Sequence, residues 1–216
     1  MLAQLSFKRA WRLWKQRGFA VQPARMRRPR ALRRDTRSLQ AAHRNHVWTY
    51  DILYDRLADG RFFKTLSILD EFTRECLAIH VAPSIRASDV IRVLQRTMQH
   101  HGRPQFLRSD NGSEFTATAV QQWLQTQQIG PIFIPPRRPQ YNGYIESFNG
   151  KFRDEVLNRE IFYSLQEAQV IIEQWCRAYN TIRPHSALGY RPPAPEAILT
   201  PSLAQPLCTV ETAITT

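Results

Sequence analysis

The chain has 216 residues and a formal net charge of +12, and 43% of its residues are hydrophobic. This length suits one ordinary domain with appendages, and the apolar fraction is sufficient for a packed core. No apolar run approaches the ~20 residues that a membrane-spanning helix needs. The three cysteines show no CxxC spacing, which argues against a zinc site and favours a reducing, cytoplasmic compartment.

The net positive charge is confined to the start of the chain. Residues 1–46 contain thirteen Lys or Arg against one acid, Asp35, so this arm carries the whole charge of +12. The remaining residues contain seventeen basic and seventeen acidic side chains and are neutral. A basic arm of this kind is typical of proteins that bind a polyanion, most commonly nucleic acid.

Two segments make up the arm. Residues 5–17 predict a short amphipathic helix, because Phe7, Trp11 and Trp14 fall at helical spacing before Gly18. Residues 22–46 have almost no periodicity and many arginines, which suits an arm lying along DNA phosphates. The arginines that we expect to contact DNA are Arg27, Arg28, Arg30, Arg33 and Arg34.

From Val47 onward the patterns alternate between strand and helix. The predicted strands are 47–54, 62–70, 75–82, PQFLRS at 104–109 and Pro131–Ile134, and the predicted helices are 87–101, Phe115–Gln128, Gly143–Leu157 and 165–180. The first three strands are close in sequence and joined by short turns, so they are antiparallel neighbours. A hairpin unit followed by alternating helices and strands predicts an α/β fold, with a mixed sheet covered by helices on both faces.

Three acids stand at informative places in this pattern. Asp51 lies in the first strand, Asp110 ends the strand PQFLRS, and Glu146 lies in a helix, with 35 residues between the last two. That insert is long enough to return a helix beside the carboxyl edge of the strand, where ligand sites of α/β sheets lie. Three carboxylates at one edge would form an oxygen-only site suited to Mg²⁺ or Mn²⁺.

The motifs around these acids resemble one protein family. WTYD, RSDNGSEF and YNGYIESFNGKFRDE are similar to the catalytic core of transposases and retroviral integrases with a D, D-35-E triad, and most similar to the second-reading-frame transposases of bacterial insertion sequences. GRFFKTLSILDEFTREC and YNTIRPHSALGYRPPAPEA resemble the same proteins. The resemblance implies a ribonuclease-H-like fold with a five-stranded sheet, in which Asp51, Asp110 and Glu146 are catalytic and hold two Mg²⁺ or Mn²⁺ ions.

The resemblance also implies a function. We expect metal-dependent DNA strand cleavage and strand transfer at the ends of an insertion element, on double-stranded DNA and in a homo-oligomer. The alternatives are a truncated remnant that binds DNA without transposing it, and a nuclease of the same fold that hydrolyses RNA in hybrids. The expected organisation is a basic arm at 1–46 with a remnant of a helix-turn-helix unit, a catalytic core at 47–198 and a tail at 199–216.

Two acids compete with the proposed triad. Asp70 ends the second strand and is a rival for the first position, while Glu114 follows Asp110 by four residues and is a rival for the third. The resemblance favours Asp51 over Asp70, and Glu114 belongs to the turn into the next helix. His185, in RPHSALGY, is interpreted as structural.

Further residues are candidate DNA contacts. On the predicted helix, Glu146 shares a flank with Gly150 and Arg153, which places an acid, a gap without a side chain, and a base along one surface. Glycine at 143 also permits close approach of a DNA backbone. The remaining candidates, from the preceding loop and the helix, are Arg137, Arg138, Tyr141 and Lys151.

Overall fold

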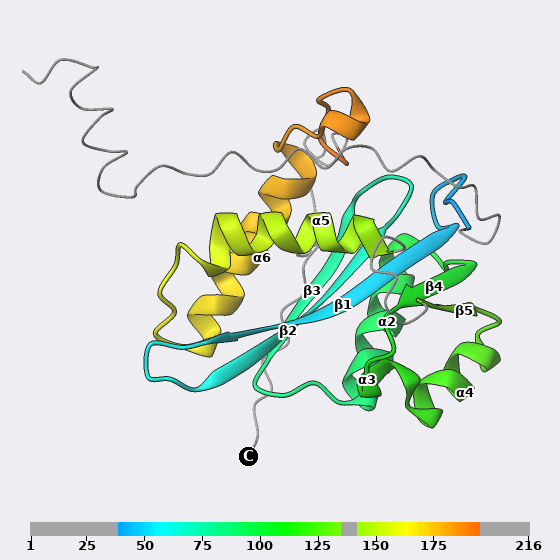
Figure 1. Ribbon diagram of the computed structural model, residues 1–216, viewed down its shortest axis with the longest axis horizontal. Helices are drawn as coiled ribbons and strands as arrows, with labels where there is room; N and C mark the ends of the chain where they lie inside the picture. Colours follow the sequence, from blue (N-terminus) through cyan, green and yellow to red (C-terminus); the bar gives the residue numbers. More distant parts are fainter. Residues whose placement is uncertain (1–38, 135–141, 195–216) are drawn as a thin grey trace, which may run out of the picture. The chain divides into compact units, whose positions relative to one another are not determined.

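The computed structural model describes residues 39–134 and 142–194. Its five strands form one sheet in the order β3-β2-β1-β4-β5 (Figure 1). Their bounds are β1 (Val47–Arg56), β2 (Phe62–Asp70), β3 (Cys76–Ala82), β4 (Phe106–Ser109) and β5 (Gly130–Phe133). Strands β1, β2 and β3 are antiparallel neighbours, whereas β4 runs parallel to β1 and β5 parallel to β4. The predicted α/β fold with a mixed sheet is therefore confirmed.

Helices make the crossovers between the parallel strands. Helix α2 (Ala87–His101) joins β3 to β4, and α3 (Ser113–Thr116) with α4 (Thr118–Thr126) joins β4 to β5. The single helix predicted over Phe115–Gln128 is wrong, because the chain is extended at Ala117 (φ −53°, ψ 133°). Phe115 and Val120 would lie roughly 140° apart on a continuous helix, and the break allows both side chains to be buried.

The alternation of β1 separates two hydrophobic clusters on opposite faces of the sheet. Trp48 and Tyr50 pack with buried residues of α2, α3 and α4, whereas Leu53 packs with α5 (Gly143–Phe152) and α6 (Leu165–Thr181). A π-helical turn, η2 (Arg153–Leu157), continues α5. Figure 1 shows α5 and α6 together on one face of the sheet and α2, α3 and α4 on the other. Within the described ranges, no helix has the length and apolarity to cross a membrane.

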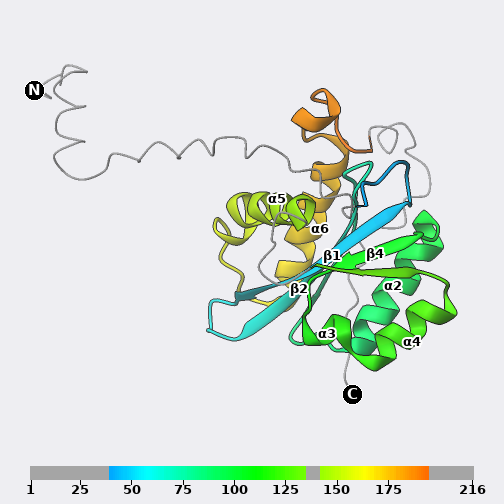
Figure 2. The same cartoon turned by 45° about the vertical axis from the view of Figure 1, so that its right-hand side comes forward.

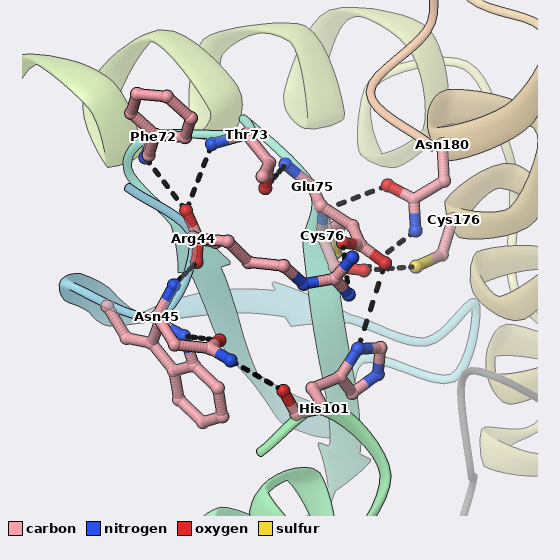
Figure 3. A network of polar contacts seen from close by, with 11 residues as sticks. Arg44, Asn45, Phe72, Thr73, Glu75, Cys76, His101, Cys176 and Asn180 are labelled. Atoms are coloured by element: carbon pink, nitrogen blue, oxygen red, sulfur yellow. Dashed lines mark hydrogen bonds and ion pairs between the residues drawn. The ribbon is translucent and has the colours of Figure 1, made fainter. Parts of the chain in front are cut away.

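The segment before β1 is attached to the core by polar contacts (Figure 3). The backbone N–H of Asn45 donates to Asp70 Oδ2 (2.6 Å), and its side-chain amide donates to the carbonyl of His101 (2.7 Å). Arg44 forms an ion pair with the buried Glu75 (3.1 Å). The compact unit that contains the sheet accordingly begins at Leu39, although the sequence analysis assigns residues 39–46 to the basic arm.

Helix α6 is joined to the first residue of β3 through one side chain. The amide of Asn180 accepts a hydrogen bond from the backbone N–H of Cys76 (2.8 Å) and donates to its carbonyl (2.8 Å). Figure 3 shows Asn180 facing Cys76 in this arrangement. Both residues are buried, so no solvent is available to replace these two bonds.

Replacing Asn180 with Ala is expected to lower the free energy of unfolding by about 2–3 kcal/mol, because two buried backbone groups lose their partner. Urea unfolding followed by circular dichroism measures this change. The control is Gln174→Ala, on an exposed position of the same helix, which we expect to change stability by less than ~0.5 kcal/mol. Equal midpoints for Asn180→Ala and the parent would show that the amide bridge contributes nothing.

Candidate active site

Asp51 lies in the middle of β1, on the face covered by α5. Its side chain is half-buried, and each carboxylate oxygen has a donor. The backbone N–H of Ile52 donates to Oδ1 (2.8 Å), and the side-chain amide of Asn149, from α5, donates to Oδ2 (2.7 Å). The hydrogen bond from Asn149 therefore connects the central strand directly to the helix that carries Glu146.

Asp110 follows the last residue of β4. The parallel pairing of β1 and β4 includes Thr49 opposite Arg108, so two residues further along each strand Asp51 and Asp110 stand at equivalent positions. Figure 2 shows β4 beside β1 at this part of the sheet. The carboxyl end of β4 thus brings Asp110 to the flank of Asp51.

The turn after β4 holds the Asp110 carboxylate in place. The backbone N–H of Gly112 donates to Asp110 Oδ1 (2.9 Å), and the amide of Asn111 donates to the carbonyl of Ile134 (2.9 Å). A Cβ atom at Gly112 would lie 3.0 Å from Asp110 Oδ1 and 3.3 Å from the ring of Phe115. The glycine therefore permits the close approach that this turn requires.

A buried ion pair anchors the strand that carries Asp110. The guanidinium of Arg108 lies 3.3 Å from the carboxylate of Glu71 and donates to the carbonyl of Leu39 (2.6 Å). Burial raises the pKa of Glu71 to about 7, and the positive charge of Arg108 opposes that rise. Arg108, two residues before Asp110, is consequently held in place by buried contacts.

Glu146 lies on α5 between two asparagines that hold the helix to β1. Asn142 accepts a hydrogen bond from the hydroxyl of Thr49 (3.2 Å), and Asn149 donates to Asp51. These asparagines are four residues before and three residues after Glu146, so all three side chains lie on neighbouring rows of the helix. The Glu146 side chain is exposed and stands beside the half-buried Asp51.

The negative charges of Asp110 and Glu146 both act on the carboxylate of Asp51. The pKa of Asp51 is raised to about 6, mainly by burial and to a smaller extent by the negative charges of Asp110 and Glu146. The hydrogen bonds from Ile52 and Asn149 oppose this shift because they stabilise the ionised form. A carboxylate so close to two others gains free energy from a bound cation.

The chemistry of these side chains fits a divalent metal. All the donors are carboxylate oxygens, which Mg²⁺ and Mn²⁺ prefer, and their mutual repulsion raises the pKa of Asp51. Among residues 39–134 and 142–194, however, no three acidic, His or Cys side chains converge closely enough to hold a metal ion as they stand. The acids are neighbours, and side-chain rotation would have to complete the coordination.

The two rival acids have other partners. Both oxygens of Asp70 accept backbone hydrogen bonds, from Asn45 at Oδ2 and from Phe72 (2.8 Å) and Thr73 (3.0 Å) at Oδ1. Asp70 is fully buried and stabilises the turn between β2 and β3. Glu114 forms an ion pair with Lys64 on β2 (2.9 Å). Both are accounted for by structural contacts.

Only two of the candidate DNA contacts, Lys151 and Arg153, lie within the described residues. Lys151 is half-buried on α5 and Arg153 is exposed where η2 begins. Arg137, Arg138 and Tyr141 lie outside the described residues, as do Arg27, Arg28, Arg30, Arg33 and Arg34 of the arm. Their proposed contacts with DNA stay predictions.

Sequence reasoning missed the asparagines that hold the site together. Asn149 lies three residues after Glu146, and this spacing placed it on the same flank of the predicted helix. Asn142 precedes the helix as a residue type that favours helix starts, although its side chain binds Thr49 and does not cap α5. Helical spacing would have been the signal for Asn149, but nothing in the sequence identified Asp51 as its partner.

Comparison with known proteins identifies the family of this chain. The integrase core domain family matches residues 41–139 and, in a second match, residues 127–193. The uncharacterized 31.7 kDa protein of insertion element IS407 from Burkholderia multivorans is 41% identical over 187 residues, which cover 87% of this chain and 67% of that protein. The uncharacterized 39.2 kDa protein of IS476 from Xanthomonas euvesicatoria is 41% identical over 191 residues, covering 88% of this chain and 55% of that protein. The chain thus spans between about half and two thirds of these relatives.

Solved structures share the fold at low sequence identity. The catalytic core domain of HTLV-2 integrase, in complex with magnesium, has a TM-score of 0.52 at 17% identity and covers 68% of this chain and 93% of that one. The catalytic core domain of BIV integrase has a TM-score of 0.53 at 18% identity, covering 69% and 91%. An intasome of simian T-cell lymphotropic virus has a TM-score of 0.59 at 17% identity, covering 82% and 62%.

The sheet order and its flanking helices define a ribonuclease-H-like fold of the integrase catalytic-core class. The 41% sequence identity to two insertion-element proteins shows which family within this class the chain belongs to. The chain belongs to the integrase-core family of insertion-element transposases.

Replacing Asp51 with Asn is expected to stabilise the fold at neutral pH. The folded-state pKa of Asp51 is raised to about 6, so its stabilising contribution is present below the unfolded pKa near 4 and is lost as pH rises through 6. The variant should gain about 1–2 kcal/mol over the parent at pH 8, and little at pH 4. Thermal melts of both proteins from pH 4 to pH 8 measure the difference, and a constant difference across this range would contradict the assignment.

Gly150 offers a separate test of the surface beside Glu146. It lies within α5, and an added Cβ would meet nothing within 4 Å. Alanine there should raise stability by about 0.5–1 kcal/mol, because glycine weakens a helix interior. If a DNA backbone lies close to Gly150, the added methyl group of the same variant weakens DNA binding. Anisotropy titrations and urea unfolding of Gly150→Ala measure the two effects, with the neighbouring exposed Ser147→Ala as control. Unchanged DNA affinity would show that no backbone approaches there.

Proposed function

We propose that this chain catalyses metal-dependent cleavage and strand transfer of DNA for a bacterial insertion element, in the cytoplasm. The observation that supports the proposal is that Asp51 and Asp110 stand at equivalent positions of the paired strands β1 and β4, while Asn149 holds α5, the helix of Glu146, to Asp51. Membership of the integrase-core family supports the same reaction class.

The proposed chemistry assigns a role to each group. Asp51, Asp110 and Glu146 would hold two Mg²⁺ or Mn²⁺ ions, which activate the attacking oxygen and stabilise the leaving oxygen of an in-line displacement at phosphorus. Asn149 keeps Asp51 turned toward α5 through its 2.7 Å hydrogen bond and favours its ionised form. Gly112 allows the backbone to hold Asp110 at the strand end. These contacts fix the positions from which the carboxylates act.

The proposed binding partners follow from the distribution of positive charge along the chain. Double-stranded DNA is the proposed substrate, both as element end and as target, and the arginine-rich arm supplies sequence-independent contacts to its phosphates. Arg153 and the loop residues Arg137, Arg138 and Tyr141 would add contacts near the carboxylates. We further propose that the chain acts as a homo-oligomer on DNA, since the related simian viral protein is described in an intasome.

Single replacements of the acids test the proposed reaction. Asp110→Asn and Glu146→Gln should each reduce Mg²⁺-dependent cleavage of end-containing duplex DNA by roughly a hundredfold or more, with circular dichroism unchanged. The control is Asp154→Asn, an exposed carboxylate on η2, which should cleave like the parent. Full activity of either acid variant would remove it from the site.

A second substrate separates the proposal from its rivals. An RNA–DNA hybrid incubated with the same proteins should remain intact. Hybrid degradation that depends on Asp110 would identify a nuclease instead. DNA binding without cleavage in Mg²⁺ or Mn²⁺ would identify a chain that kept the fold and lost the reaction.

A further inference from the structure

A second polar cluster lies on the flank of α5 that faces away from Glu146. Lys151 follows Glu146 by five residues, which places it roughly 140° around the helix. Tyr144 and Glu155 lie on the same flank, seven residues before and four residues after Lys151. The cluster is therefore separate from the three acids, although the same helix carries both.

Arginines from two other segments meet this flank. Arg74, in the turn between β2 and β3, stacks its guanidinium on the ring of Tyr144 at 3.6 Å from the centroid and donates to the carbonyl of Glu71. Arg183, after α6, binds Glu155 through two nitrogens, at 2.6 Å and 3.0 Å. Segments that are far apart in sequence thus bring two guanidinium groups to the flank of α5 that carries Lys151.

The cluster contains more positive charge than its acid neutralises. Glu155 is fully engaged, because Trp175 also donates to it (3.0 Å) besides Arg183. The ammonium of Lys151 is half-buried and has no hydrogen-bond or ion-pair partner within residues 39–134 and 142–194. Burial lowers the pKa of Lys151, and the charges of Arg183 and Arg74 lower it further. An anion would relieve this repulsion.

The loop that carries Arg183 supports the same conclusion. His185 is buried against the ring of Tyr179 (centroids 4.6 Å apart), and burial, with the charges of Lys151 and Arg183, lowers its pKa to about 4. The backbone N–H of Tyr190 donates to the carbonyl of His185 (2.8 Å), and the Tyr190 side chain is 75% exposed. Aromatic rings exposed to solvent are common on surfaces that contact nucleic acid.

We propose that Arg74, Lys151 and Arg183 form a binding site for a phosphate of the DNA backbone other than the one that reacts. This inference rests on the proposed action on DNA, because it names a second place where the same duplex is held. Arg74 and Arg183 offer planar guanidinium donors, and Lys151 offers a point charge on the same flank of the helix. A duplex held on both flanks of α5 would have its reacting phosphodiester positioned against Glu146.

The test is the salt dependence of DNA binding by the full chain. Lys151→Gln should make the log–log slope of affinity against salt less steep by about 0.9, the loss of one phosphate contact. Lys151→Arg keeps the charge and should retain the parental slope. The matched control is Arg103→Gln, which removes one positive charge from an exposed residue that donates to the carbonyl of Gln127, and its slope should not change. Fluorescence anisotropy on a nonspecific duplex gives all four slopes.

Stability measurements complete the experiment. Lys151→Gln should melt at or above the temperature of the parent, because a half-buried ammonium without a partner is removed. Inorganic phosphate should raise the melting temperature of the parent more than chloride of equal ionic strength, and this difference should vanish in Lys151→Gln. A failure to fold, an unchanged salt slope, or equal stabilisation by phosphate in both proteins would overturn the proposal. None of these readouts depends on cleavage, so an inactive chain would refute the proposed function without refuting the phosphate site.

Discussion

The half-buried carboxylate of Asp51 is the constraint on which the arrangement of this protein depends. A charged oxygen in the central strand of a sheet is costly to bury, and two further acids next to it increase the cost. The fold offsets part of this cost with the backbone N–H of Ile52 and the amide of Asn149. Because Asn149 belongs to α5, the hydrogen bond that stabilises Asp51 also holds the helix that brings Glu146 to the site.

The position of α5 depends in turn on what lies behind it. The aromatic rings of Phe148 and Phe152 pack against Trp175 of α6, with centroids 5.5 Å and 5.0 Å apart. Helix α6 is joined to β3 through the two hydrogen bonds between Asn180 and Cys76. A continuous path of packed and hydrogen-bonded groups thus runs from the edge of the sheet through α6 to the carboxylates.

Helix α5 carries Glu146 on one flank and Lys151 on the other. On the flank of Glu146, acids repel phosphate until a cation neutralises them. On the flank of Lys151, cations repel one another until an anion binds. A helix is only about 10 Å wide with its side chains, which is less than the width of a DNA duplex. One duplex is therefore large enough to satisfy both flanks, which gives α5 a physical reason to carry both kinds of charge.

Local patterns in the sequence determined a large part of this structure. Alternation in residues 47–54 and the β-forming run at 62–70 predicted the hairpin, and helical spacing predicted α2, α5 and α6 with their apolar faces. The order of strands and helices was enough to expect Asp110 at the carboxyl edge of the sheet, whereas Asp51 was assigned to the site by the resemblance of its motif. The spacing of the motifs added Glu146. Each of these inferences depends only on neighbours in the chain or on general rules of connection.

Only the tertiary structure decided which residues form hydrogen bonds with one another. The hydrogen bond from Asn149 to Asp51 joins residues 98 positions apart, and that from Asn180 to Cys76 joins residues 104 apart. The break at Ala117 arose because Phe115 and Val120 both had to be buried, which the local helical pattern did not show. The sequence placed Asp70 at a strand end as a rival catalytic acid, and only the fold shows that three backbone N–H groups bind its carboxylate. The identity of a partner depends on which surfaces pack together, and packing is a property of the whole chain rather than of any stretch of it.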